Sequence, residues 1–351
     1  MNNQSLGGSD SRICIAIDAM GGDNGVKVTV PATLNVALNH PHVRFCLVGL
    51  KNQLPKLQDL PENVSLIAAT EVVEMDEPAR TALRQKKNSS MRVALNQVNA
   101  GHAAACVSAG NTGALMALSH HLLKMLPEIS RPAIVTQLPT LSGYVRMLDL
   151  GANVSASSQQ LYEFALMGAA IACASGIQCP KVALLNVGHE LIKGRAEVKS
   201  ANDRLMMSQG FDYLGYVEGS EIFSGRADVI VCDGFVGNVV LKSCEGMLGM
   251  LKSIVVEVYQ GSWLKSFMMW MMKRVFQNAL SRFHPDQHNG AVLAGLNGLV
   301  IKSHGAANIT AFEHAILTAL TLVHEEASST VNQHIDRLFS LNDEELSCSQ
   351  D

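Results

Sequence analysis

Turns that combine glycine or other small residues with Asp or Asn follow five short apolar runs of this 351-residue chain. They occupy residues 18–23, 108–113, 149–153, 186–188 and 233–238. Glycine lets the backbone approach a ligand closely, and N–H groups at the start of a following helix favour an anion. One such turn is a weak sign, because turns need these residues for conformational reasons. Five of them predict a binding site for an anionic ligand.

The periodicity of the apolar residues indicates which elements position these turns. Short apolar runs alternate with longer segments of helical period, which predicts a mostly parallel sheet with helices on both faces. We expect strands at residues 13–18, 43–49, 64–69, 104–108, 133–138, 145–150, 182–187 and 229–232. We expect helices at residues 26–39, 91–100, 113–125, 157–175, 196–209, 237–260, 262–281, 290–303 and 306–326. In such folds ligands collect beyond the carboxyl ends of the strands, where the five turns lie.

The composition is that of a globular protein. Hydrophobic residues make up 48% of the chain and charged residues 17%, which excludes a mainly disordered protein and favours some surface buried against a partner. The length allows one large domain or two closely joined ones, and we predict a single α/β domain over residues 12–340. The formal net charge of −4 gives no general attraction to nucleic acid, so we expect no nucleic-acid partner.

Cysteine usage and the apolar runs bear on the compartment. The eight cysteines form no C-x-x-C pair and several lie in apolar runs, which indicates buried thiols in a reducing compartment. The first twelve residues are polar and glycine-rich, unlike a signal peptide. No apolar run approaches the roughly 20 residues that cross a bilayer. We therefore expect a cytoplasmic protein.

Motifs of several other enzyme classes are missing from the sequence. No G-x-G-x-x-G follows the first expected strand, and no G-x-x-x-x-G-K-[ST] occurs. Ser108 is not in a nucleophile elbow, because Cys106 stands where G-x-S-x-G needs its first glycine. His189-Glu190 and His324-Glu325 lack the second histidine of a zinc protease. We expect no covalent nucleophile, no metal and no redox cofactor.

The motifs taken together resemble those of the PlsX phosphate acyltransferases over roughly residues 12 to 330. The matching segments, in the family's order, are residues 15–23, 108–114, 131–133, 151–153, 164–168, 231–239, 289–291 and 303–305. The resemblance implies a Rossmann-like three-layer α/β/α sandwich similar to the isopropylmalate and isocitrate dehydrogenases. It also implies a homodimer that transfers a long-chain fatty acyl group from acyl carrier protein to inorganic phosphate. The acyl phosphate product would feed glycerophospholipid synthesis, with a downstream acyltransferase as a further partner.

This chemistry fits the residues that are present. Phosphate titrates near neutral pH, so its dianion is already a nucleophile, and the thiolate leaving group departs without much protonation. The protein needs no strong base and no acyl-enzyme. It has to hold an anion in line with a carbonyl group and stabilise the oxyanion that forms. Glycine-rich turns, amide side chains and one cation are suitable groups for that task.

The resemblance implies catalytic roles for Lys193 and Asn238. We assign Lys193 to the charge of phosphate or oxyanion, and Asn238 to a hydrogen bond with the acyl carbonyl or phosphate. The alternatives are a solvated loop lysine and a helix cap. His189 stands where the family usually has an acidic residue, which leaves only Glu190 of the acidic group. The substrate-binding candidates are Asp18, Gly21, Gly22, Asp23, Ser108, Asn111, Thr112, Gly113, Asn153, Asp233, Gly237 and His304.

An apolar segment flanked by basic residues lies late in the chain, where residues 267–272 are six consecutive large apolar residues. A core or dimer helix is one interpretation, and an interfacial membrane helix or a partner contact is the other. The family's helical projection falls in this region, so we expect one at residues 245–290, packed in the dimer at its base. Its predicted contacts with the inner face of the cell membrane or with acidic carrier protein are Lys265, Met268, Met269, Trp270, Lys273, Arg274 and Arg282.

Three other functions stay open on the sequence alone. A short-chain phosphate acyltransferase that uses coenzyme A would differ in acyl-chain preference. A dehydrogenase of the related fold would bind NAD, although no cofactor fingerprint or acidic metal-binding set is evident. A non-catalytic membrane scaffold for lipid-synthesis enzymes would release no acyl phosphate, and the change at His189 keeps this alternative open.

Overall fold

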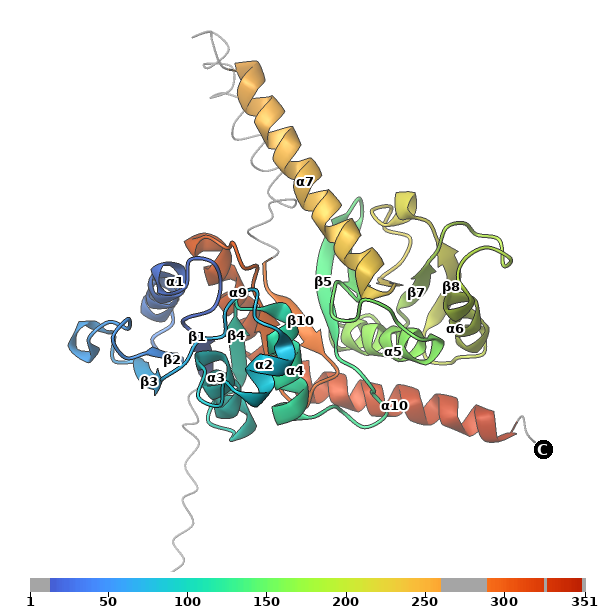
Figure 1. Ribbon diagram of the computed structural model, residues 1–351. Helices are drawn as coiled ribbons and strands as arrows, with labels where there is room; N and C mark the ends of the chain where they lie inside the picture. Colours follow the sequence, from blue (N-terminus) through green and yellow to red (C-terminus); the bar gives the residue numbers. More distant parts are fainter. Residues whose placement is uncertain (1–12, 260–288, 325–326, 349–351) are drawn as a thin grey trace, which may run out of the picture.

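The computed structural model describes residues 13–259, 289–324 and 327–348. Eleven strands form one sheet in the order β3-β2-β1-β4-β11-β10-β5-β6-β9-β7-β8. Figure 1 shows helices on both faces of this sheet, and α7 rising from between the two halves of the molecule. Neighbouring strands are parallel except at the β11–β10, β10–β5 and β5–β6 pairs. The predicted fold class, a mostly parallel α/β sheet, is confirmed.

The amino-terminal half holds four parallel strands, β1 (Cys14–Asp18), β2 (Arg44–Leu50), β3 (Val64–Ala69) and β4 (Ala105–Ser108). Alternate side chains of β1 point to opposite faces of the sheet. Ala16 joins the core cluster that contains helix residues Met91 and Leu115, and Ile17 joins the cluster that contains Ala32 and Phe312. The helices of this half are α1 (Val26–Asn39), α2 (Ala79–Arg84), α3 (Ser90–Asn99), α4 (Thr112–Leu123) and α9 (Ile309–His324).

The second half is built around the β5–β6 hairpin and three further parallel strands. The strands are β5 (Ala133–Thr140), β6 (Gly143–Leu148), β7 (Lys181–Leu185), β8 (Asp212–Val217) and β9 (Val229–Val231). Helix α5 (Ser158–Ala174) starts at a capping box in which Ser157 and Gln160 satisfy each other's backbone N–H groups. It packs with α6 (Ala196–Met206) and α10 (Ala327–Cys348), whereas Val240 and Leu241 of α7 pack on the opposite face.

The predicted helix at residues 290–303 is wrong. These residues form an antiparallel hairpin, β10 (Ala291–Ala294) and β11 (Leu299–Lys302), which joins the two halves of the sheet. Short apolar runs cannot be assigned to helix or strand from periodicity alone. Gly295 has a φ of 85° in the connection, a conformation that suits a turn between strands.

The other expected elements that fall on described residues agree with the structure apart from shifts at their ends. β3 and α1 have the predicted bounds, while β8, α2 and α10 were not predicted. Two short 3-10 turns, η1 (Leu57–Asp59) and η2 (Gly219–Glu221), complete the elements of the described parts. The single-domain prediction for residues 12–340 stays a prediction.

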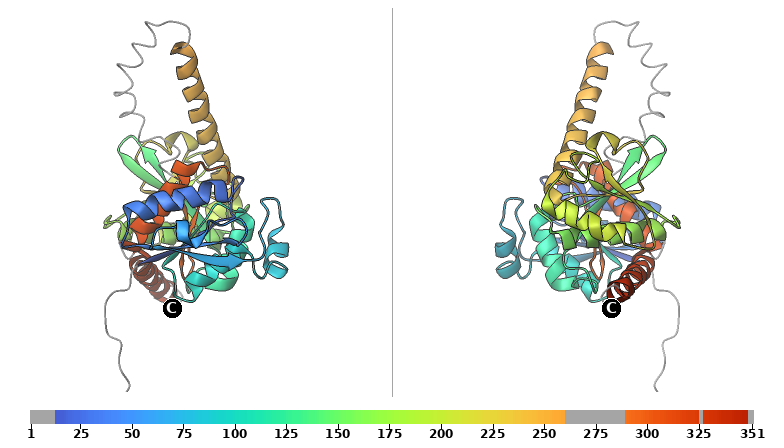
Figure 2. Two further views of the ribbon diagram at one scale, coloured as in Figure 1. Left: turned by 90° about the vertical axis from the view of Figure 1, so that its left-hand side faces the viewer. Right: turned by 90° about the vertical axis from the view of Figure 1, so that its right-hand side faces the viewer.

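Helix α7 (Gly234–Tyr259) is the most prominent projection of the molecule. Its first turns pack on the second half, and the rest extends away from the body, as both views in Figure 2 show. The predicted helix at residues 262–281 and the contact residues from Lys265 to Arg282 lie outside the described residues. Over the parts of the chain that are described, no helix is long and apolar enough to cross a membrane.

Candidate active site

The carboxyl ends of β1 and β4 bring two predicted site residues together. Ser108 Oγ donates a hydrogen bond to Asp18 Oδ2 at 2.7 Å, and Gly110 N donates to Ser108 Oγ at 3.1 Å. Asp18 is 1% exposed, and burial raises the pKa of its carboxyl group against the effect of its hydrogen bonds. Neighbouring parallel strands therefore place the turns at residues 18–23 and 108–113 side by side.

A third motif, at residues 303–305, closes on these two turns. Asp23 N donates to the carbonyl oxygen of Gly305 at 2.9 Å. Gly22 has a φ of 90°, and a Cβ atom there would lie 2.9 Å from the same oxygen. A Cβ atom at Gly21 would lie 2.7 Å from the backbone nitrogen of Gly110. Glycine is required at positions 21 and 22 because the backbones approach too closely for a side chain.

Lys302, which is not among the site residues predicted from the sequence, lies at the centre of these three motifs. It ends β11, which pairs in parallel with β4 so that Lys302 is opposite Ser108. Its side chain is 9% exposed, and Nζ donates to the Ala109 carbonyl oxygen at 3.3 Å and to the Ser303 carbonyl oxygen. Burial, reinforced by nearby Lys242, lowers the pKa of Lys302 to about 8, while Asp18 and Asp23 oppose the shift.

Helix α7 reaches the same place from the second half of the molecule. Lys242 Nζ lies 2.8 Å from His304 Nε2 and 2.8 Å from Glu245 Oε2. Burial and the neighbouring Lys242 lower the pKa of His304. Asn238 precedes Lys242 by four residues, so both side chains lie on one face of the helix. Lys242 of α7 therefore meets His304 in the loop after β11, while Asn238, one turn earlier on the same helix face, lies beside Gly151.

Asn289 fixes the geometry of that loop. Its Nδ2 group donates to Ser303 Oγ at 2.8 Å and to the Ala311 carbonyl oxygen at 2.7 Å. Its Oδ1 atom accepts a hydrogen bond from His304 N at 3.0 Å. The side chain of Asn289 thus holds the backbone of His304 in place.

Asp149 organises the turn after β6. Its Oδ1 atom accepts hydrogen bonds from Ile134 N at 3.0 Å and Ala152 N at 2.9 Å. Its Oδ2 atom accepts from the backbone and side-chain nitrogens of Asn153, at 2.6 and 2.9 Å. Asn153 Nδ2 also donates to the Pro132 carbonyl oxygen at 2.8 Å. Both side chains hold the turn together, and a contact between Asn153 and substrate stays a prediction.

Asp233 caps the first turn of α7. Its Oδ1 atom accepts from Val236 N at 2.9 Å, and its Oδ2 atom accepts from Arg195 at 2.5 Å. The helix-cap interpretation of Asn238 is therefore wrong, because Asn238 lies inside α7 and faces Gly151. A Cβ atom at Gly237 would collide with the Asp149 carbonyl oxygen, so glycine lets α7 pack closely on this turn.

Lys193 lies in the exposed loop after β7. Its Nζ atom is 2.9 Å from Glu190 Oε1, its side chain is 48% exposed, and this contact lowers the pKa of Glu190. Within the described parts of the chain no hydrogen bond or ion pair joins Lys193 to Asn238. His189 Nδ1 is 3.1 Å from the Tyr216 carbonyl oxygen and Nε2 is 2.9 Å from Glu221 Oε2. The unusual His189 ties this loop to the segment after β8.

Asn111 belongs to the support of the site. Its Oδ1 atom caps α4 by accepting from Ala114 N at 3.0 Å, and Nδ2 donates to the carbonyl oxygens of Met75 and Glu77. Thr112 and Gly113 form the first residues of α4. No contact in the structure tests whether Asn111, Thr112 or Gly113 touch substrate.

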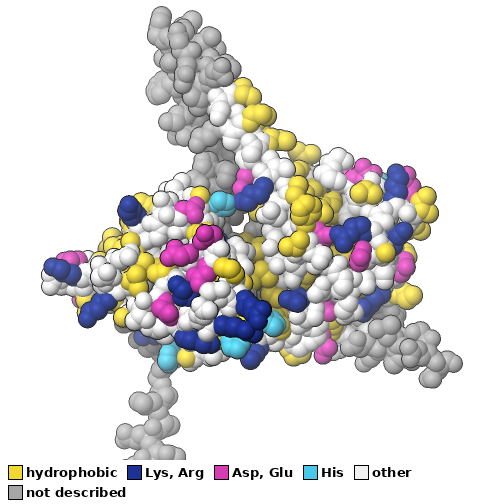
Figure 3. Space-filling view, viewed as in Figure 1, with side chains coloured by type: hydrophobic (Ala, Val, Ile, Leu, Met, Phe, Trp, Pro, Cys, Tyr) yellow, Lys and Arg dark blue, Asp and Glu magenta, His cyan; other side chains and the backbone are white. Residues whose placement is uncertain are grey.

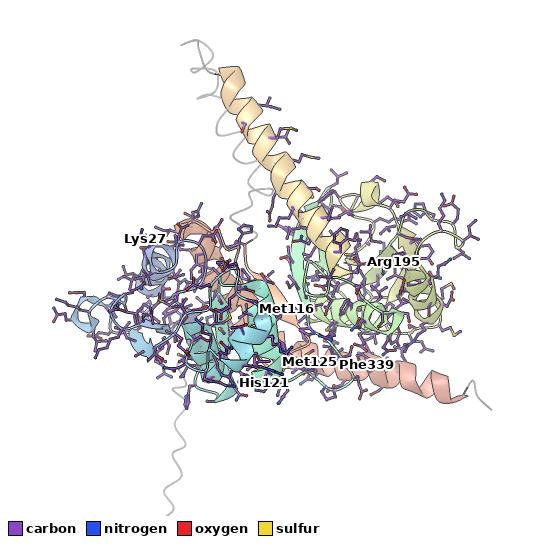
Figure 4. All side chains as sticks on the ribbon, viewed as in Figure 1. Lys27, Met116, His121, Met125, Arg195 and Phe339 are labelled. Atoms are coloured by element: carbon purple, nitrogen blue, oxygen red, sulfur yellow. The ribbon has the colours of Figure 1, made fainter. Side chains whose placement is uncertain are left out.

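An apolar cavity of about 420 Å³ lies beside the first turns of α7. Its charged lining residues are Arg195, Glu197 and Asp233, and Figure 4 shows Arg195 near the base of α7, across the molecule from Lys27. The apolar side chains that line it include Leu161, Leu184, Val198, Val231, Val236 and Val240. No cluster of acidic, histidine and cysteine side chains suited to a metal ion occurs among the described residues.

Known proteins agree with this arrangement of motifs. A family model described as "Fatty acid synthesis protein" matches residues 13–330. A phosphate acyltransferase of Coxiella burnetii is 46% identical over 329 residues, which cover 92% of this chain and 96% of the relative. The chain belongs to the PlsX family of phosphate acyltransferases. It is an acyltransferase, and the resemblance drawn from its motifs is confirmed.

Two further relatives bear the same description. The phosphate acyltransferase of Alcanivorax borkumensis is 48% identical and covers 88% of this chain and 93% of its own. The phosphate acyltransferase of Paraburkholderia phytofirmans is 50% identical and covers 86% of this chain and 83% of its own. The PlsX chain is therefore matched over nearly its whole length by several curated proteins.

Solved structures of low sequence identity share the fold. A phosphotransacetylase from Streptococcus pyogenes has a TM-score of 0.59 at 18% identity and covers 89% of this chain and 94% of its own. A branched-chain phosphotransacylase from Enterococcus faecalis has a TM-score of 0.58 at 14% identity, with 89% and 99% covered. A 4-hydroxythreonine-4-phosphate dehydrogenase from Klebsiella pneumoniae has a TM-score of 0.53 at 14% identity, again with 89% and 99% covered. These likenesses confirm the fold class.

Proposed function

We propose that this enzyme transfers a long-chain fatty acyl group from acyl carrier protein to inorganic phosphate, and that it releases acyl phosphate and free carrier protein. The observation that carries this proposal is the convergence of Lys302, Lys242 and His304 on the junction where the turns at residues 18–23 and 108–113 pack against the motif at residues 303–305. Family membership supplies the acyl transfer, and the cations supply a place for an anionic acceptor.

The reaction asks for positioning rather than for a strong base. A phosphate oxygen attacks the thioester carbonyl carbon, a C–O bond forms, and the C–S bond breaks to release a thiolate that takes a proton from solvent. The nucleophile is already an anion, so the protein has to orient it and stabilise the oxyanion. Asn238, on the α7 face that carries Lys242, donates a hydrogen bond to the acyl carbonyl oxygen. Lys193 adds positive charge when its loop meets the substrate.

The apolar cavity beside α7 is the site of the hydrocarbon chain in this proposal. Val236 and Val240 of α7 line the cavity. Going around the helix from this cavity face to the face that carries Asn238, the next side chains are those of Phe235 and Val239, and both are exposed. We expect Val240→Phe to shorten the preferred acyl chain, because each methylene excluded costs about fourfold in binding. Val239→Phe, outside the cavity, is the matched control. An unchanged chain-length profile for Val240→Phe would show that the chain binds elsewhere.

Exposed apolar side chains on α7 support the proposed partners. Met247, Met250, Leu251 and Ile254 recur at helical spacing along the helix, and Figure 3 shows hydrophobic side chains along it. A face of this kind fits packing in a homodimer, with the segment beyond α7 reaching the membrane or carrier protein. Replacement of Met268, Met269 and Trp270 by serine should abolish cosedimentation with lipid vesicles. Unchanged cosedimentation would end the proposed membrane contact.

A thiol-release assay tests the choice of donor. Palmitoyl-acyl carrier protein, palmitoyl-coenzyme A and acetyl-coenzyme A are compared with and without inorganic phosphate. We expect phosphate-dependent release that is fastest with the carrier-protein thioester. Preference for acetyl-coenzyme A would favour the short-chain alternative, and no release from any folded sample would favour the scaffold.

A further inference from the structure

We propose that Lys302, with Lys242 and His304, forms the subsite that binds a phosphate group in this enzyme. The inference rests on the proposed function and assigns one of its substrates to a defined place. The group bound is either free inorganic phosphate or a phosphate carried by the acyl donor. Both present non-bridging phosphate oxygens to the cations, and the experiment below distinguishes the two sources.

The ammonium group of Lys302 is buried, and only two of its three N–H groups have an acceptor in the described parts of the chain. A lysine has three N–H donors, and Nζ donates to the carbonyl oxygens of Ala109 and Ser303. No other hydrogen-bond or ion-pair partner of Nζ occurs among the described residues. A side chain that is 9% exposed gains little from water, so the remaining N–H needs an acceptor from outside the chain.

Charges around Lys302 leave room for an anion. Lys242 is close enough to lower its pKa, and Lys242 shares Glu245 with His304, whose Nε2 atom lies 3.8 Å from Glu245 Oε2. The buried Asp18, whose Oδ2 atom accepts a hydrogen bond from Ser108, and the exposed Asp23 oppose the effect of Lys242 on Lys302, but no hydrogen bond or ion pair joins either carboxylate to Nζ in the described parts of the chain. A phosphate dianion would offset the repulsion between the two lysines, and its oxygens could accept bonds from both.

The backbone around Lys302 is shaped for close approach. Lys302 donates to the carbonyl oxygen of Ala109, between Ser108 and Gly110, and α4 begins shortly afterwards at Thr112. Gly22 packs against the carbonyl oxygen of Gly305 and against Ala109, so the turns meet tightly at this junction. N–H groups at the start of a helix favour an anion, and α4 starts close to the buried cation.

The test measures binding without turnover. Inorganic phosphate is titrated into the wild-type protein and into Lys302→Met, Lys302→Arg and Lys242→Met by isothermal calorimetry. Lys56→Met, which removes an exposed lysine in the connection between β2 and β3, is the matched control. We expect Lys302→Met to raise the Kd for phosphate at least tenfold, Lys302→Arg to raise it less, and Lys56→Met to leave it unchanged.

A second arm identifies the source of the phosphate group. The KM for palmitoyl-acyl carrier protein and the KM for phosphate are measured for the same variants. A rise in the KM for phosphate alone assigns the subsite to the nucleophile, and a rise in the KM for the donor alone assigns it to the donor's phosphate. Unchanged Kd and unchanged KM values in a folded Lys302→Met protein would overturn the proposal. Tight phosphate binding without turnover would instead contradict the proposed function.

Discussion

Lys302 brings a positive charge into the buried junction of three motifs. Its ordinary pKa of 10.5 falls to about 8 because burial disfavours the ammonium form. Asp18 and Asp23 act on its charge from β1 and the following turn, Lys242 acts on it from α7, and His304 lies in the adjoining loop. Glu245 of α7 pairs with Lys242. The lysine is therefore charged at neutral pH but loses its proton within reach of ordinary assay conditions.

We expect the KM for phosphate to rise as the pH passes about 8, because Lys302 then loses the charge that attracts the dianion. Below neutral pH the KM should rise again, since phosphate becomes a monoanion. Steady-state assays from pH 6 to 9.5 measure both limbs. Lys302→Arg, which stays charged, should lose the alkaline limb, and an identical limb in that variant would show that another group titrates.

Lys193 poses a different question, because its charge is exposed and already paired with Glu190. We expect Lys193→Ala to lower kcat about a hundredfold, the effect of losing one oxyanion-stabilising group, with an unchanged melting temperature. Glu190→Gln frees the lysine and should leave most activity. Near-normal turnover of a folded Lys193→Ala protein would assign it to the solvated loop instead.

At the scale of elements, α7 connects the two sides of the site. Its first turn is fixed by Asp233 and Gly237, and its exposed face carries Asn238 beside Gly151 and Lys242 beside His304. A shift of this helix would move two proposed substrate contacts at once. The contacts that fix its first turn therefore also fix the positions of Asn238 and Lys242.

We expect Asp233→Ala to destabilise the protein by about 1–2 kcal/mol, because α7 loses its cap and Arg195 loses one of its two ion-pair partners. Asp233→Asn keeps an oxygen for Val236 N and should recover part of that loss. Urea unfolding of the three proteins gives the comparison. Equal stability of Asp233→Ala and the wild type would mean that the cap contributes nothing.

The β10–β11 hairpin, and with it the position of Lys302, could not be predicted from the sequence. The turns after β1, β4, β6 and β9 could be predicted, because Gly, Asp and Asn at strand ends have a local cause. Lys302 could not be placed, because its environment depends on β11 pairing with β4, nearly two hundred residues earlier. The available signal was a lysine that ends the apolar run 299–301, directly before Ser303-His304-Gly305.

For the whole molecule, the two halves of the sheet contribute different parts of one site. The amino-terminal half supplies Asp18, Ser108 and, through β11, Lys302, and the second half supplies Asn238 and Lys242. Family motifs gave the function and the order of the turns. Which side chains meet across the junction follows only from their arrangement in space. That arrangement places Lys302 beside Lys242 and His304, whereas Lys193 pairs with Glu190 in an exposed loop.

Trapping of acyl phosphate by hydroxylamine tests the proposed reaction most directly. Purified protein is mixed with palmitoyl-acyl carrier protein, with and without inorganic phosphate, and the hydroxamate is quantified beside a Lys302→Met sample. We predict hydroxamate that requires phosphate and falls sharply in the variant. Absence of phosphate-dependent hydroxamate from a folded wild-type protein, with coenzyme A thioesters also tested, would contradict acyl transfer to phosphate.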